Sequence, residues 1–162
     1  EAMKYLPEEY LFVIVGGGDV FEKLKGIIID NKLENKVMIK GKVPYQELIQ
    51  YTYQADLGLS LDKNTNLNYE FSLPNKLFDY IHHETPVLAS NLTEIRKIVE
   101  GNGVGWILQN HNPETIANQI QGIFANESDY LAKKENTKLA AEKLTWENEE
   151  LVLKHLYSDL LQ

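Results

Sequence analysis

Short apolar runs recur along the chain, each bounded by polar or glycine-rich segments. The first, YLFVIV, is followed directly by three glycines, and the last, VGWIL, follows a glycine. Continuous apolar runs of this length are typical of strands that are buried on both faces of a parallel sheet. The predicted strands are residues 10–15, 36–41, 56–61, 86–90 and 104–108.

A segment with helical character follows each predicted strand. These segments cover about 19–32, 44–53, the stretch after Pro74, 93–100 and 112–124, and two more helices are expected between 128 and 161. Asp19, Thr93 and Asn112 are candidate N-caps, and Pro74 and Pro113 fit first helical positions. The alternation predicts an α/β fold with a Rossmann-like open parallel sheet flanked by helices. Because no linker or repeat interrupts it, we expect a single domain over residues 1–162.

Composition excludes several classes of function. Hydrophobic residues make up 43% and charged residues 25% of the chain, which is ordinary for a globular protein. The net charge of −8 and the single arginine, Arg96, argue against a nucleic-acid surface. The chain has no cysteine, so disulfides and thiolate metal sites are excluded. An anionic ligand would therefore need helix N-termini, backbone amides and a few lysines.

The glycine turn Gly16-Gly17-Gly18-Asp19 is the first candidate binding feature, at the end of a predicted strand. Open parallel sheets bind ligands at the carboxyl ends of their strands. Glycines let a backbone approach a ligand closely and present its N–H groups. The turn is not a P-loop, because no Gly-Lys-Ser or Gly-Lys-Thr follows it. It is not a dinucleotide fingerprint either, because Phe21 stands where the third glycine would be. A simple tight turn explains it equally well.

The second candidate feature is the polar loop 62–72 together with the helix after Pro74. The first-turn amides of that helix could bind a phosphate. Lys76 and Asp79 share one face of the helix, and Asp79 could accept hydrogen bonds from the two hydroxyls of a ribose. The spacing alone favours an exposed helix pair without a function over a ligand site.

The histidines give no indication of a metal site. His82 and His83 are adjacent, so they cannot share one helix face, and no ligand set for a closed site surrounds them in the sequence. We therefore expect neither a metal nor another cofactor. His111 is isolated in the sequence and is expected at the surface.

Several segments in series resemble the C-terminal half of retaining GT-B fold glycosyltransferases of family 4, also called group 1. These segments are LFVIVGGGD, VMIKGKVPYQELIQYTYQADLGLSL, SLPNKLFDYIHHETPVLAS, EIRKIVEGNGVGWIL and TWENEELVLKHLYSDLL, which cover essentially the whole chain. In that family this half binds the nucleotide-sugar donor, and an N-terminal domain binds the acceptor. The resemblance implies transfer from a UDP- or GDP-linked sugar to a saccharide or lipid-linked acceptor. It further implies hexosyl transfer in bacterial surface polysaccharide, capsule or glycolipid biosynthesis, on the cytoplasmic side of a membrane.

The resemblance also assigns roles to individual residues. Asp79 occupies the position of the family's ribose-binding glutamate, although its side chain is one methylene shorter. The family's second acidic residue would fall at Phe71, so the nearest acid, Glu70, is the candidate catalytic residue. Glu84 stands where a glycine usually closes the helix, so the helix must end differently. The implied donor-binding residues are Gly16, Gly17, Ile39, Lys40, Gly41, Ser72, Leu73, Pro74, Lys76 and Asp79.

The family's arginine and lysine that clamp the donor diphosphate lie upstream of the residues in this chain. We therefore expect the chain to be part of a longer protein, without the domain's first strand and the N-terminal acceptor domain. Weak donor binding and no transfer activity are expected of the chain alone. The segment 145–162 is expected to pack toward the N-terminal domain, which would also make any membrane contact.

Two other functions remain open. A non-catalytic flavodoxin-like nucleotide-binding module would share the fold, but the sequence shows no flavin-phosphate loop or acidic cluster at a strand end. Half of a GT-B fold epimerase would share it too, but no constellation of lysines and histidines indicates that chemistry.

Overall fold

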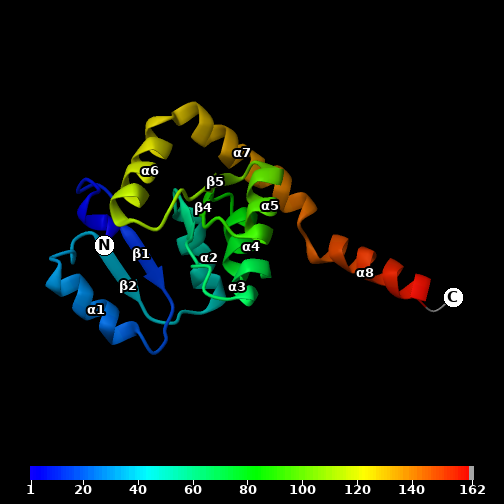
Figure 1. Cartoon of the computed structure of the whole chain (residues 1–162), viewed down its shortest axis with the longest axis horizontal. Helices are drawn as coiled ribbons and strands as arrows, with labels where there is room; N and C mark the ends of the chain where they lie inside the picture. The colour runs from blue at the N-terminus through cyan, green and yellow to red at the C-terminus, as the bar shows by residue number, and fades with distance from the viewer. Residues whose placement is uncertain (161–162) are drawn as a thin grey trace.

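The strands of this computed structural model, which describes residues 1–160, are parallel and flanked by helices (Figure 1). The strands are β1 (Phe12–Val15), β2 (Val37–Lys40), β3 (Gly58–Ser60), β4 (Val87–Ala89) and β5 (Gly105–Ile107). Each lies inside one of the predicted apolar runs, and every paired neighbour is parallel. The α/β class predicted from the sequence is confirmed.

The strands form two separate sheets, whereas one continuous sheet was expected. β1 pairs with β2, and the second sheet has the order β3-β4-β5. Among residues 1–160 no ladder joins β1 to β3. Side chains connect the sheets instead, because Phe12 and Ile14 of β1 pack against the same core cluster as Leu59 of β3 and Leu88 of β4.

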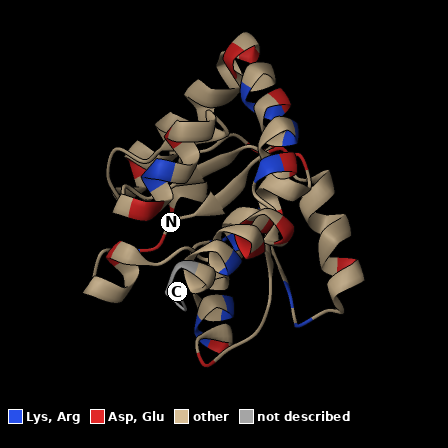
Figure 2. Ribbon diagram, turned by 90° about the vertical axis from the view of Figure 1, so that its right-hand side faces the viewer, with Lys and Arg blue, Asp and Glu red and all other residues tan. Residues whose placement is uncertain are grey.

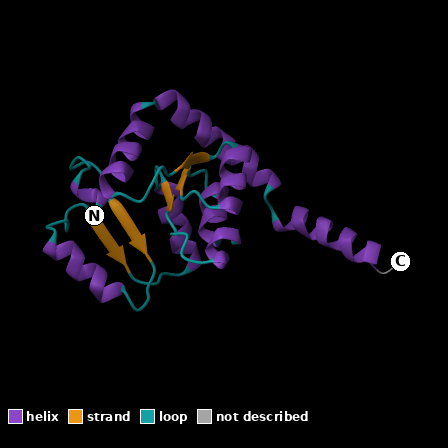
Figure 3. Ribbon diagram, viewed as in Figure 1, coloured by secondary structure: helices purple, strands orange, loops and turns teal. Residues whose placement is uncertain are grey.

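The helices lie on both sides of the strands, and α8 extends away from the rest of the molecule (Figure 3). The helices are η1 (Ala2–Lys4), α1 (Phe21–Asp30), α2 (Tyr45–Gln54), α3 (Leu67–Phe71), α4 (Asn75–His82), α5 (Thr93–Asn102), α6 (Pro113–Ala125), α7 (Glu127–Lys143) and α8 (Trp146–Leu160). Helix α3 lies in the segment expected to be a polar loop. Asn66 explains it, because its side chain accepts a hydrogen bond from the backbone N–H of Tyr69 and so starts a short helix.

The predicted helix starts hold for α6 and fail for α1, α4 and α5. Pro74 was expected to be the first residue of its helix, but it is the N-cap of α4, which begins at Asn75. Asn112 caps α6 with its side-chain oxygen, and Pro113 is the first helical residue, as predicted. Asp19 does not cap α1, which begins at Phe21 without a side-chain cap. Thr93 is the first residue of α5 rather than its cap.

The core has two faces because successive residues of β4 point to opposite sides of the sheet. Val87 and Ala89 are fully buried in a cluster with Leu77 of α4 and Val99 of α5. Leu88, between them, is buried in the other cluster, which includes residues of β1, β3 and α6. β4 is thus the strand that both helical layers cover.

Glu84 closes α4 by adopting the backbone conformation that a glycine usually provides. Its φ angle is 58°, in the left-handed region that L side chains rarely occupy. Its N–H donates to the carbonyl of Ile81, and the N–H of Thr85 donates to that of Tyr80. A carboxylate side chain therefore occupies a strained C-terminal position.

Replacing Glu84 by glycine is expected to stabilise the protein. Removing the strain of the left-handed conformation stabilises the folded state by about 1–2 kcal/mol. The greater freedom of glycine in the unfolded chain destabilises the folded state by about 0.5–1 kcal/mol. We expect a net gain of about 0.5–1 kcal/mol in the free energy of unfolding, measured by urea denaturation.

Glu84→Ala is the matched control. It also removes the exposed 3.8 Å ion pair with Lys138 but keeps the strained backbone, so it should give no gain. Equal stability of the alanine and glycine variants would contradict this account.

Candidate functional site

The glycine turn after β1 lies beside the segment that follows β2. Gly16 has a φ angle of 146°, which favours glycine, and its N–H donates to the carbonyl of Lys40 at 3.2 Å. A Cβ added at Gly17 would lie 3.4 Å from Cγ of Lys42, so the lysine stem lies directly over the turn. The structure therefore brings the predicted residues of these two strand ends together and adds Lys42 to them.

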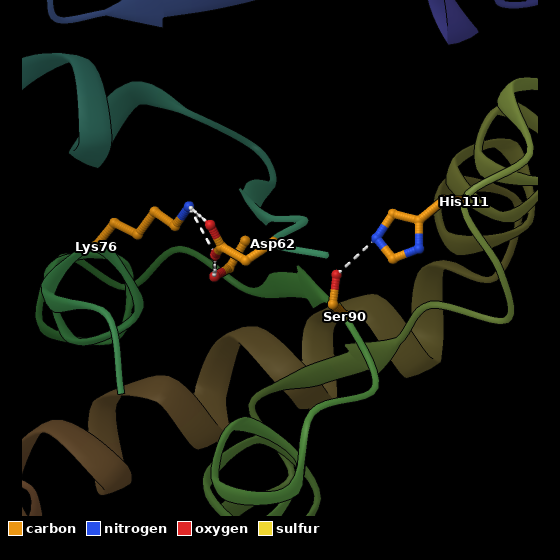
Figure 4. A network of polar contacts seen from close by, with 5 residues as sticks. Asp62, Lys76, Ser90 and His111 are labelled. Carbon is orange, nitrogen blue, oxygen red and sulfur yellow. Dashed lines mark hydrogen bonds and ion pairs between the residues drawn. The ribbon is translucent and has the colours of Figure 1, made fainter. Parts of the chain in front are cut away.

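A second polar group forms at the end of β3. The Nζ atom of Lys76 lies 3.1 and 2.9 Å from the two carboxylate oxygens of Asp62. The hydroxyl of Ser60 also donates to Asp62, at 3.3 Å (Figure 4). Asp62 thus neutralises the charge of Lys76 within the protein. Beside this ion pair, a cavity of about 50 Å³ is lined by Asp62, Tyr69, Ser72, Pro74, Leu92 and Ile95.

Asp79, on α4, already accepts a hydroxyl group in this structure. The hydroxyl of Tyr45, the first residue of α2, donates to Asp79 at 3.4 Å. Partial burial, and then the charge and hydrogen bond of Asp79, raise the pKa of Tyr45. The segment 41–45 therefore contacts both predicted parts of the site, through Lys42 at the glycine turn and through Tyr45 at Asp79.

The first turn of α4 leaves its backbone donors without a side-chain cap. Pro74 is the N-cap residue and cannot supply a side-chain acceptor. Leu73 precedes it and is exposed. The N–H groups at such a helix start carry partial positive charge and favour an anion.

Glu70 has a different set of contacts. One carboxylate oxygen accepts the backbone N–H of Thr93 at 3.1 Å and also its hydroxyl. The other oxygen accepts the side-chain amide of Asn64. Glu70 thus fastens α3 to the N-terminus of α5 and supplies the cap that Thr93 was expected to provide. A catalytic role for Glu70 stays a prediction.

The sequence indicated an isolated surface histidine at His111, and the structure shows otherwise. His111 is half-buried, and its Nε2 lies 3.0 Å from the hydroxyl oxygen of Ser90 (Figure 4). Ser90 follows β4, and His111 lies in the loop after β5. The pair therefore extends the polar edge of the sheet beyond Asp62.

Backbone carbonyls account for the other histidine contacts at this end of α4. His83 Nδ1 lies 2.7 Å from the carbonyl oxygen of Asp79, and His82 Nε2 lies 2.8 Å from that of Leu144. Within residues 1–160 no group of three or more His, Asp or Glu side chains is placed to hold a metal ion.

Sequence reasoning missed three polar residues of this edge, Lys42, Tyr45 and His111, and it included Asp62 only as the first residue of the polar loop 62–72. A signal for Lys42 and Asp62 was present, since each comes within two residues of the end of a strand. Parallel strands place such residues on one edge. No local signal indicated the contacts of Tyr45 and His111, because their partners lie 34 and 21 residues away.

Comparison with known proteins now places the chain in a family. Residues 1–143 match the family described as glycosyl transferases group 1. The chain belongs to this family. Among curated relatives, the amylovoran biosynthesis glycosyltransferase AmsK of Erwinia amylovora is 26% identical over 132 residues. That match covers 80% of this chain but only 32% of AmsK, so the chain spans about a third of its relative.

Solved structures of other proteins share the fold. Anabaena HepE in complex with UDP superposes with a TM-score of 0.78 at 18% identity, over 97% of this chain and 43% of HepE. WaaG, a glycosyltransferase involved in lipopolysaccharide biosynthesis, superposes with a TM-score of 0.71 at 17% identity, over 87% of this chain and 37% of WaaG. The expected GT-B family membership and Rossmann-like fold are confirmed.

Tyr80 connects the site to the stability of the fold. A Cβ added at Gly58 would lie 2.4 Å from the Tyr80 ring, which therefore packs directly on β3. Burial raises the pKa of Tyr80, the backbone N–H of Leu59 partly offsets this, and the charges of Asp79 and Asp62 add to the rise.

The raised pKa predicts a loss of stability in alkali. Below the ordinary tyrosine pKa of about 10, the contribution of Tyr80 to the free energy of unfolding is fully present. This contribution is lost as the pH rises through the higher pKa of Tyr80 in the folded state. Urea denaturation at increasing pH above about 9 should therefore show a falling free energy of unfolding. Tyr80→Phe should flatten this fall, whereas Tyr157→Phe on the exposed α8 should not; equal slopes for both variants would contradict the assignment.

Proposed function

We propose that this chain is the donor-binding half of a hexosyltransferase that uses a nucleoside diphosphate sugar. The contacts of segment 41–45 carry the proposal, because they join the glycine turn to Asp79. Membership of the group 1 family supports sugar transfer. HepE, which shares the fold, binds UDP and UDP-glucose, and this supports a uridine donor.

The ribose, phosphates and base of the proposed donor each have a counterpart in the site. Asp79 accepts the hydroxyls of the ribose, as it now accepts the hydroxyl of Tyr45. The uncapped start of α4 and the amides of the glycine turn meet the phosphates. The backbone of residues 39–41 meets the base.

The proposed chemistry uses local positive groups rather than a positive surface. The net charge is −8, and Figure 2 shows Lys and Arg interspersed with Asp and Glu along the ribbon. Charge that develops on the leaving nucleoside diphosphate would be stabilised by backbone N–H groups and Lys42. We propose that no metal takes part and that the sugar's configuration is retained, as in the family.

The remaining partners belong to the proposed whole protein. Its acceptor is a saccharide or lipid-linked saccharide in surface polysaccharide or glycolipid biosynthesis, which the names of AmsK and WaaG support. The acceptor-binding domain packs on α8, whose apolar side chains are exposed. These include Trp146, Leu151, Val152, Leu156 and Tyr157.

We place the whole protein in the cytoplasm, with any membrane contact made by its other half. No helix within residues 1–160 is long and apolar enough to cross a membrane.

Titration of isotope-labelled protein with UDP, GDP, ADP and FMN, followed by NMR, tests the proposed function. Saturable shifts with one nucleoside diphosphate at residues 16–17, 39–42 and 72–79 are expected. Shifts with FMN alone would indicate the flavodoxin-like alternative. Absence of shifts with all four nucleotides would contradict donor binding by this chain.

Asp79→Ala should abolish most of this binding while the fold is retained. A hydrogen bond to a charged group contributes about 1.5–3 kcal/mol, so losing the contacts to two ribose hydroxyls should weaken affinity by about 100-fold or more. Asp30→Ala, at the exposed end of α1, is the control. Wild-type affinity in Asp79→Ala would show that the ribose assignment is wrong.

Lys42→Gln should weaken binding of the diphosphate specifically. Lys76 is paired with Asp62, and Nζ of Lys40 lies 5.9 Å from the ring centroid of Tyr51, whereas Lys42 has no acidic partner within residues 1–160. We expect about a tenfold loss of UDP affinity, with uridine affinity unchanged. Lys23→Gln on α1 is the control; an equal loss for uridine and UDP would exclude a phosphate contact.

A further inference from the structure

A groove of about 540 Å³ lies between β5, α6 and α7, and none of its lining residues belongs to the candidate donor site. Figure 1 shows these three elements together, on the side of the molecule where α6 meets α7. Its size is in the range of small-molecule sites. The residues that line it include Trp106, Gln109, Thr115, Asn118, Gln119 and Asp129.

The lining is polar but carries no positive charge. Within the described range 1–160, no Lys, Arg or His lines the groove. Its carboxylate, on Asp129, accepts the indole N–H of Trp106 at 2.8 Å. A phosphate or carboxylate ligand would find no cation here, so the chemistry favours an uncharged ligand.

The backbone edge beside the groove is already occupied by a side chain. The amide of Gln119 donates to the carbonyl of Ile107 at 2.9 Å, and its oxygen accepts the N–H of Gln109 at 3.2 Å. Gln119 thus pairs with the open edge of β5 as the peptide group of another strand would. An extended peptide cannot add to this edge without displacing Gln119.

Three polar side chains that line the groove remain unused. Within residues 1–160 the side chains of Gln109, Thr115 and Asn118 make no hydrogen bond with the protein. Amides and hydroxyls both donate and accept, which is what a ligand rich in hydroxyl groups requires. The half-buried indole of Trp106, held by Asp129, adds an apolar ring surface for the C–H groups of such a ligand.

We propose that this groove is a second binding site, which takes an uncharged saccharide chain. Trp106 packs on a sugar ring, and the free amides and hydroxyl of the groove bind its hydroxyl groups. The inference stands on the groove alone, so it holds or fails independently of the donor site.

Tryptophan fluorescence can test this directly. The chain has two tryptophans, and Trp146→Phe on the exposed α8 leaves Trp106 as the reporter. The probes are maltohexaose, cellohexaose and a neutral galactan oligosaccharide, with UDP and inorganic phosphate as charged comparisons. A saturable change with at least one oligosaccharide is expected, together with NMR shifts of the side-chain amides of Gln109 and Asn118. Neither UDP nor phosphate should reproduce it.

A variant in the groove distinguishes oligosaccharide binding there from a nonspecific effect of the oligosaccharide on the fluorescence. Asn118→Ala combined with Thr115→Ala removes two of the free polar groups and should weaken oligosaccharide affinity by about tenfold. Gln46→Ala, on the exposed face of α2, is the control and should leave affinity unchanged. The proposal is overturned if no oligosaccharide gives a saturable change, if phosphate or UDP gives the same change, or if the groove variant binds like the control.

Discussion

The pairing of β4 between β3 and β5 is the interaction on which the rest of the structure depends. The ladder continues past the strands, since the N–H of Ser90 donates to the carbonyl of Ser60 and the N–H of Leu108 donates to that of Ala89. The parallel register therefore ends all three strands at one edge, where Asp62 and Ser90 stand. β4 is buried on both faces, so it cannot shift its register without exposing its core side chains.

The sequence allowed the strands, their parallel direction and most helices to be predicted, because apolar runs and helix starts such as Asn112-Pro113 are local signals. The split between the sheets could not be predicted, since strand pairing depends on distant segments. Helix α3 was missed because only the cap at Asn66 distinguishes it from a polar loop. Of the site, the strand-end glycines and Asp79 had signals in the sequence, whereas the contact with Tyr45 exists only in the folded chain.

A protein with a net charge of −8 has few cations to offer an anionic ligand, and the structure uses most of those near the site. Lys76 is held between the carboxylate oxygens of Asp62, and Lys40 lies over an aromatic ring. Lys42 differs, because only its stem is engaged, over the turn at Gly17. A Cβ at Gly17 would be in ordinary van der Waals contact with this stem, so the lysine lies close over the backbone of the turn.

The carboxylates of this end of the molecule differ in how firmly they are held. Asp62 is bound by a lysine and a serine, and Glu70 by a helix N-terminus and an asparagine. Asp79 has one long side-chain bond, at 3.4 Å, to the hydroxyl of an exposed tyrosine. A bond of that length contributes little and is readily exchanged. A ribose hydroxyl can replace the tyrosine hydroxyl without leaving a buried charge unpaired. Asp79 is therefore the acidic residue of this edge best suited to bind a ligand reversibly.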